Sequence, residues 1–254
     1  MPPECNEVER RDMIKQTINK LHKELPSTVR LVAVSKFHPF ESIQEAYQAG
    51  QRIFAESRPQ ELMAKVTRLE QVRLERGEPD YMSDIQWHFI GHLQTNKLKM
   101  VLPYASLIQS VDSVRLLDAI QKWGKTNGCV ISVLLEPHVA AEESKQGFEA
   151  AEIYSILKSA ERQEAPSAVD SVNPYPNICF RGIMGMATFT DDETVVRGDF
   201  AALCEIFKTC RLRYPSLASN FTELSIGMSD DYPLAIEYGS TMVRIGSMIF
   251  GDRH

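Results

Sequence analysis

The sequence has few cysteines, no long apolar run and no excess of basic residues. Its five cysteines are scattered and lack the CxxC spacing that is typical of a metal site or a redox pair. No apolar stretch approaches the roughly 18 residues of a membrane span, and residues 1–20 contain no signal-peptide core. The formal net charge of −6 argues against a nucleic-acid surface. We therefore expect a cytoplasmic, soluble protein with reduced cysteines and neither nucleic-acid nor membrane partners.

What is present is an ordinary globular composition, with 43% hydrophobic and 24% charged residues among 254. This is enough apolar material for a sizeable core, and a single α/β barrel fills about 250 residues. No long linker or internal repeat interrupts the chain. We expect one domain over residues 1–254.

Strand-like and helical segments alternate along the chain. The expected strands are Val29–Ser35, Arg52–Glu56, Gln86–Ile90, Leu107–Val111, Val130–Leu135, Ile178–Met184, Leu224–Gly227 and Met242–Phe250. The expected helices are Glu7–Leu25, Phe40–Ala49, Ser113–Lys125, Phe148–Ala160 and Val195–Tyr214. Repeated βα units favour parallel strands with right-handed crossovers, so an α/β fold is predicted, a (β/α)8 TIM barrel with an extra N-terminal helix. A doubly wound sheet is the alternative.

A lysine ends the first predicted strand, in the stretch "LVAVSKFHPF" at residues 31–40. Barrel enzymes and binding proteins build their sites at the carboxyl ends of the strands, which is where Lys36 would lie. A lysine there is either a solvated strand end or a covalent anchor. The residues at the ends of the other strands distinguish between these two interpretations.

The ends of the last two strands have the composition of a phosphate site. Gly227 and Gly246 allow close backbone approach, Ser229 offers a hydroxyl and a helix cap, and Arg244 offers a fixed positive charge. Alternatively, the glycines form tight turns and Arg244 pairs with a core carboxylate. An amine facing a phosphate site across the barrel mouth is, however, the arrangement that pyridoxal 5′-phosphate requires.

Other patterns have simpler explanations. His88 and His92 have the spacing of two metal ligands on a helix, but they fall on a strand and the following turn, so we expect no metal and place His88 near the barrel interior. Asp230 and Asp231 suit a helix start. The segments at residues 65–84 and 161–177 exceed usual loop lengths and are interpreted as peripheral decorations.

Five stretches together resemble the pyridoxal-phosphate homeostasis protein family, single-domain relatives of the N-terminal barrel of alanine racemase. They are "LVAVSK" at 31–36, "WHFIGHLQTNK" at 87–97, "RGIMGM" at 181–186, "LSIGMSDD" at 224–231 and "GSTMVRIGSMIFG" at 239–251. They follow one another in the family's order and cover nearly the whole chain.

The resemblance implies that Lys36 carries the cofactor as an aldimine. Its phosphate would be held by Ser229, Arg244 and Gly246 with the backbone of Gly227, Met228 and Ser229, and its ring would be lined by Met186 and Ser225. One departure is visible at residues 54–61, "FAESRPQE", where Ser57 replaces an asparagine that is a cofactor contact in the family; Ser57 is counted as the ninth candidate cofactor-binding residue, although its side chain is shorter. Pro59 suits the first turn of the following helix.

The resemblance also implies a function, namely control of the intracellular pyridoxal phosphate (vitamin B6) supply without turnover. Racemisation needs a second acid/base group opposite the lysine, and we expect none in a chain without a second domain. The alternatives are a racemase-like pyridoxal-phosphate enzyme and a phosphate-binding barrel enzyme that does not use this cofactor. The expected partners are pyridoxal phosphate and apo-enzymes that receive it, and the chain is expected to be a monomer.

Overall fold

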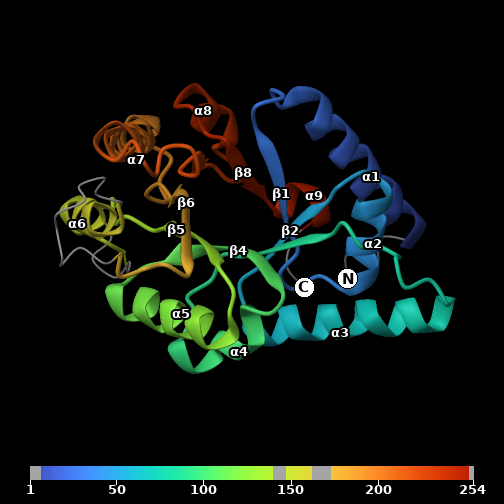
Figure 1. Cartoon of the computed structure of the whole chain (residues 1–254). Coiled ribbons are helices and arrows are strands. Elements are labelled where there is room, and N and C mark those ends of the chain that lie inside the picture. Colours follow the sequence, from blue (N-terminus) through green and yellow to red (C-terminus); the bar gives the residue numbers. More distant parts are fainter. Residues whose placement is uncertain (1–6, 140–146, 162–172, 252–254) are drawn as a thin grey trace.

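The computed structural model describes residues 7–139, 147–161 and 173–251. Its strands form a closed barrel in which each strand pairs in parallel with its neighbours in chain order (Figure 1). The strands are β1 Arg30–Val34, β2 Ile53–Glu56, β3 Gln86–Phe89, β4 Ala105–Val111, β5 Ile131–Leu135, β6 Ile178–Met184, β7 Glu223–Ser225 and β8 Met242–Ile245. The closed ring confirms the predicted barrel and excludes the doubly wound sheet.

Helices surround this barrel. They are α1 Glu7–Glu24, α2 Phe40–Gln48, α3 Pro59–Arg76, α4 Leu98–Val101 after the 3-10 turn η1 Thr95–Lys97, α5 Val114–Asn127, α6 Ala150–Ala160, α7 Glu193–Arg213, α8 Tyr232–Glu237 and α9 Ser247–Phe250. The extra helix α1 packs against α2 and α9. In Figure 1, α3, α4 and α5 lie along one side of the barrel, and α7 and α8 lie along the other.

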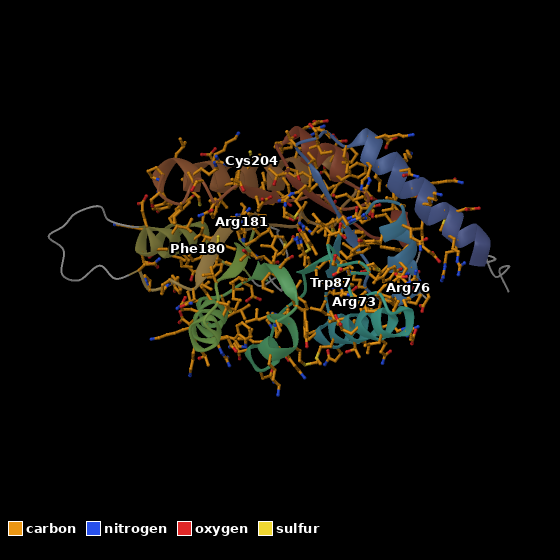
Figure 2. All side chains as sticks on the ribbon, turned by 45° about the vertical axis from the view of Figure 1, so that its right-hand side comes forward. Arg73, Arg76, Trp87, Phe180, Arg181 and Cys204 are labelled. Atoms are coloured by element: carbon orange, nitrogen blue, oxygen red, sulfur yellow. The ribbon has the colours of Figure 1, made fainter. Side chains whose placement is uncertain are left out.

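The alternation of side chains along each strand divides the core into two layers. Inward-facing residues, including Val32, Val34 and Met184, form a small cluster inside the barrel. Outward-facing residues such as Trp87 and Phe180, labelled in Figure 2, belong to the larger cluster between the strands and the helices. The outer layer therefore supplies most of the apolar burial, and the inner layer is free to include polar groups.

Several predicted element boundaries hold, and two interpretations change. The predicted eighth strand reaches Phe250, but the strand ends at Ile245, because Gly246 leaves the strand and α9 follows from Ser247. Segment 65–84 begins inside α3, which starts with Pro59 at its first turn and ends at left-handed Gly77. It is not purely peripheral, since Lys65 is buried against the barrel. Residues 162–172 of the other segment lie outside the described residues.

Within the described part of the chain, no helix has both the length and the apolar character needed to cross a membrane.

Candidate functional site

A cavity of about 350 Å³ opens at the carboxyl ends of the strands and brings most of the predicted site residues together. Seven of the nine line it, namely Lys36, Ser57, Met186, Met228, Ser229, Arg244 and Gly246. They come from β1, β2, β6, β7 and β8 or from the loops that follow them. A cavity of this size is in the range of small-molecule sites.

The two-residue repeat of the strands explains this convergence. Val32 and Val34 point into the barrel, so Lys36 is the next inward position as β1 ends. In the same way Ala55 is followed by Ser57, Met184 by Met186, and Met242 by Arg244. Residues far apart in the sequence meet because each is the last inward-facing position of its strand or the next such position beyond the strand's end.

The turn that carries Lys36 is fixed from both sides by helix α3. The Lys65 ammonium donates to the carbonyl oxygen of Ser35 at 2.7 Å, and the Phe37 N–H donates to the Glu61 carboxylate at 2.9 Å. Phe37 has a positive φ of 68°, and the Arg58 guanidinium lies 4.4 Å from its ring centre. Positive φ is costly for a bulky residue and needs such support. Residues of α3 therefore set the backbone that aims Lys36.

A buried ion pair anchors α3 to the barrel wall. Lys65 Nζ lies 2.6 Å from Glu56 Oε1, and the Ser35 hydroxyl donates to the same oxygen at 2.6 Å. Glu56 is fully buried, and its Oε2 has no hydrogen-bond partner among the described residues. Burial raises the pKa of Glu56, and the charge of Lys65 opposes that rise.

Arg244 is a buried cation without a carboxylate contact. It is 4% exposed, and it donates from Nη1 to the Ser225 carbonyl and hydroxyl oxygens and from Nη2 to the Gly185 carbonyl, at 2.7 to 2.9 Å. It forms no ion pair with any described residue. Burial lowers its pKa to about 10, against the longer-range attraction of Glu136 and Asp231, so it stays charged at pH 7.

This guanidinium retains donor capacity toward the cavity. An arginine has five N–H donors, and three are used by the contacts above. A buried charge that meets only neutral acceptors is strongly stabilised by an anion. Arg244 lines the cavity, so the site favours an anionic ligand group.

A polar chain continues from Arg244 across the barrel interior. The Ser225 hydroxyl donates to Gln109 Oε1 at 2.7 Å, and Gln109 Nε2 lies 2.8 Å from His88 Nδ1. Burial, aided by the charge of Arg30, lowers the pKa of His88 to about 3, so the ring is neutral and Nδ1 accepts. The prediction that His88 packs inside the barrel is confirmed. Ser225 is fully buried and reaches the cavity only through Arg244.

The loops after β7 and β8 meet as predicted. The Ser247 hydroxyl donates to the Ser229 hydroxyl at 3.1 Å, which joins the two loops at the cavity wall. Gly227 is buried beneath them with a φ of +93°, and a Cβ there would lie 2.6 Å from the Cβ of Ala235. Ser229 was also expected to cap a helix, but the residue before α8 is Asp231, whose carboxylate accepts the Met228 N–H.

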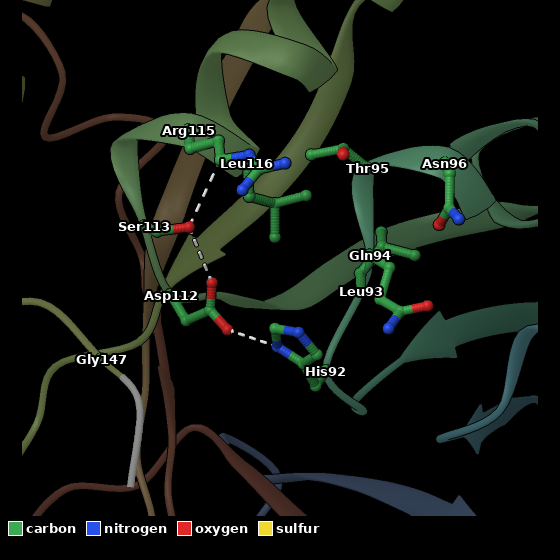
Figure 3. A pocket seen from close by; sticks show the side chains of 10 residues that line it. All are labelled: His92, Leu93, Gln94, Thr95, Asn96, Asp112, Ser113, Arg115, Leu116 and Gly147. Carbon is green, nitrogen blue, oxygen red and sulfur yellow. Dashed lines mark hydrogen bonds and ion pairs between the residues drawn. The ribbon is translucent and has the colours of Figure 1, made fainter.

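A second cavity of about 700 Å³ lies beside the ends of β3 and β4 (Figure 3). Here His92 Nδ1 is 2.8 Å from the Asp112 carboxylate, which also accepts the Ser113 hydroxyl at 3.0 Å. His88 and His92 therefore have separate partners on either side of Ile90, which lines the first cavity. Among the described residues, no group of three or more metal-ligating side chains is assembled.

Sequence reasoning missed three functional positions. Gln109 follows Leu107 on the inward face of β4, and a polar residue at an inward position was a usable signal. Lys65 follows Leu62 by three residues and precedes Leu69 by four, so it falls on the buried stripe of α3. Glu61 gave no comparable signal, because its contact with Phe37 depends on how α3 packs against the turn.

Comparisons with known proteins agree with this geometry. The family model "Alanine racemase, N-terminal domain" matches residues 10–254. The chain is 34% identical over 246 residues to the pyridoxal phosphate homeostasis protein of Haemophilus influenzae, covering 96% of this chain and 94% of that protein. It is also 34% identical to the human protein of that name, covering 95% and 83%.

A solved structure with the same fold is PipY of Synechococcus elongatus with PLP bound. It is 30% identical, with a TM-score of 0.79, and the alignment covers 94% of this chain and 100% of PipY.

Proposed function

The chain belongs to the alanine racemase N-terminal domain family, and we propose that it binds pyridoxal 5′-phosphate and takes part in the control of its supply within the cell. The observation that carries this proposal is one cavity with an amine at one wall and, at another, a buried guanidinium whose direct contacts are neutral oxygens, Lys36 and Arg244. The cofactor has the matching groups, an aldehyde and a phosphate.

Each residue then has a defined role. Lys36 forms a reversible covalent bond with the aldehyde carbon, which is the chemistry that the cofactor supplies. Ser229, Gly246 and Arg244 provide hydroxyl, backbone and charge for the anionic part, with Gly227 and Met228 shaping the loop. Met186 and Ser57 line the cavity beside Lys36, and Ser225 orients Arg244 from below.

We further propose that the protein stores or delivers the cofactor and does not turn over amino acids. The relatives that resemble it over nearly their whole length are named for homeostasis. Among the described residues that line the cavity, the titratable side chains besides Lys36 and Arg244 are His38 and Asp230, and the His38 ring stacks on Phe250 at 5.2 Å. A racemase-like enzyme is the alternative, and His38 or Asp230 would then act as its second acid/base group.

The first test identifies the covalent anchor. The protein is incubated with pyridoxal phosphate, reduced with borohydride and mapped by peptide mass spectrometry. We expect the cofactor on Lys36, its loss in Lys36→Ala, and its retention in the control Lys99→Ala, an exposed lysine of α4. Labelling of another lysine in the unaltered protein would refute the assignment.

A second test separates carrier from enzyme. The loaded protein is incubated with a panel of amino acids in D2O, and deuterium at the α-carbon is followed by NMR. We expect no exchange beyond that of free cofactor at the same concentration. Catalytic exchange that disappears in Asp230→Asn or His38→Gln would establish the racemase-like alternative.

A further inference from the structure

A groove of about 680 Å³, distinct from the two cavities described above, opens beside the 350 Å³ cavity that Lys36 lines. It lies between the loops that follow β6 and β7 and the first turns of α7 and α8. The groove and the cavity share four lining residues, Met186, Phe189, Met228 and Asp230. A molecule in this groove would therefore reach toward the cavity that contains Lys36.

The shared wall of the groove is apolar and open to solvent. The Phe189 side chain is 90% exposed and Met228 is 38% exposed, although both lie at the edge of a cavity. Single exposed apolar residues are common on protein surfaces. These two line the same groove, so they offer apolar surface to the stem of a ligand.

The rest of the groove is negatively charged. Among the described residues that line it, five carry carboxylates, namely Asp191, Glu193, Asp230, Asp231 and Glu237, and one carries a guanidinium, Arg197. Arg197 is already paired with Glu193 at 2.6 Å and with Glu237 at 3.0 Å. Asp191 and Asp230 are exposed and form no ion pair with a described residue. The groove thus complements a cation with an apolar stem.

We infer that this groove docks a lysine side chain presented by a basic polypeptide segment, and that it is the route by which the cofactor leaves Lys36. The inference rests on the proposed function, since an incoming amine would replace Lys36 on the cofactor's aldehyde carbon. A lysine has a four-carbon stem for the apolar wall and an ammonium for the carboxylates. Basic neighbours in the same segment add attraction to the acidic rim.

The charge of the groove also selects against free amino acids. In a free amino acid the reactive amine is adjacent to a carboxylate, which Asp191 and Asp230 repel. In a polypeptide the lysine amine stands at the end of a side chain, and the backbone that carries it has no charged carboxylate. The same groove therefore favours transfer to a protein and disfavours reaction with amino-acid substrates.

The transfer step balances without an added reactant. The incoming ammonium loses two protons as its nitrogen forms the double bond to the aldehyde carbon. The double bond from that carbon to the protonated Lys36 nitrogen breaks, and Lys36 takes up the two protons and leaves as an ammonium. No oxidation or reduction takes place.

The first arm of the test measures docking without the cofactor. Two fluorescent hexapeptides are used, each with one lysine, flanked by arginines in one and by glutamates in the other. By anisotropy in 20 mM salt we expect the arginine peptide to bind at least about tenfold more tightly than the glutamate peptide, and most of this difference to disappear in 0.5 M salt. Equal binding of the two peptides would overturn the docking surface.

Matched variants localise the effect. Asp191→Asn/Asp230→Asn removes two charges from the groove and is expected to weaken binding of the arginine peptide about fivefold to tenfold. The control Glu75→Gln/Glu78→Gln makes the same change of charge at the far end of α3 and is expected to leave binding unchanged. An equal effect of both doubles would mean attraction to net charge only and would overturn the inference.

The second arm measures transfer from the loaded protein to the same peptides, trapped by borohydride and quantified by mass spectrometry. We expect faster transfer to the arginine peptide, with the advantage lost in Asp191→Asn/Asp230→Asn. If Lys36 takes up no cofactor, the proposed function fails, yet the anisotropy arm still decides whether the groove docks basic segments. If Lys36 is loaded but transfer ignores peptide charge, the exit route is wrong and the proposed function stands.

Discussion

Two buried cations lie near the carboxyl ends of the strands, Lys65 outside the barrel wall and Arg244 inside it, and their surroundings are opposite. Lys65 is neutralised by Glu56 at 2.6 Å and lines no part of the 350 Å³ cavity. Arg244 meets neutral oxygens and lines that cavity. A buried ion pair that is complete serves the structure, whereas a buried charge held by neutral groups is prepared for an anionic ligand.

Their relation to Lys36 differs accordingly. Lys65 acts on the backbone next to Lys36, through the carbonyl of Ser35, and so fixes the direction of the anchor. Arg244 acts across the cavity, and its own position depends on Ser225 and Gln109. Mutations in the outer ion pair, Lys65 with Glu56, should therefore change stability most. Mutations in the inner polar chain that runs from Arg244 through Ser225 and Gln109 to His88 should change affinity for the cofactor most.

The largest expected effect is on stability, from Lys65→Met. This change leaves the Glu56 carboxylate buried and unpaired, which we expect to cost about 3 to 5 kcal/mol in the free energy of unfolding. Urea denaturation at pH 8 measures it. The double variant Glu56→Gln/Lys65→Met removes both charges and should recover most of the loss.

The pH dependence of the Lys65→Met variant sharpens this prediction. Without Lys65, the pKa of Glu56 rises further above its unfolded value, so folding takes up a proton and the variant gains stability as the pH falls from 8 toward 5. A cost below about 1 kcal/mol at pH 8, equal to that of the surface change Lys99→Met, would contradict the structural role of the outer pair.

The next effect is on affinity, from Arg244→Met. Loss of charge-assisted contacts to an anion should weaken pyridoxal phosphate binding by about 1.5 to 3 kcal/mol, or roughly 10-fold to 150-fold. Absorbance titration measures the affinity, and urea denaturation should show a smaller change in stability than Lys65→Met gives. Unchanged affinity together with a large loss of stability would reverse the comparison of the two cations.

The last prediction concerns His88, at the far end of the inner polar chain, and the change in the free energy of unfolding when the pH is lowered. Because the pKa of His88 is about 3 in the folded protein and about 6.5 when unfolded, the unfolded chain binds the proton first as the pH falls. The contribution of the neutral His88 ring to folding stability is therefore complete above pH 6.5 and is lost toward pH 3, with a loss of about 2 kcal/mol at pH 5.

Urea denaturation between pH 7 and pH 5 measures this slope. His88→Asn keeps an acceptor for Gln109 and should flatten the slope, whereas His92→Asn should retain it. If the slope of His88→Asn equals that of the unaltered protein, His88 is not the buried neutral group that ends the inner chain.

Much of the fold and part of the site could be predicted from local patterns. The alternation of strand and helix segments predicts parallel strands with right-handed crossovers, and eight such units in one chain favour the closed barrel over a doubly wound sheet. The inward repeat of each strand places Lys36, Met186 and Arg244 at the same rim. The predicted end of the last strand was wrong, because the apolar run over residues 242–250 does not distinguish a strand from a strand that is followed at Gly246 by a short helix.

The sequence by itself determined the alternating strand and helix units, the order of the strands along the chain and the residues at their carboxyl ends, because these follow from periodicity and chain connectivity. Only the tertiary structure decided that Lys65 closes an ion pair while Arg244 keeps free donor capacity, and that Asp191 and Asp230 face the same groove. The reason is physical. The state of a buried charge depends on which groups the folded chain brings within a few ångströms, and those groups come from distant parts of the sequence.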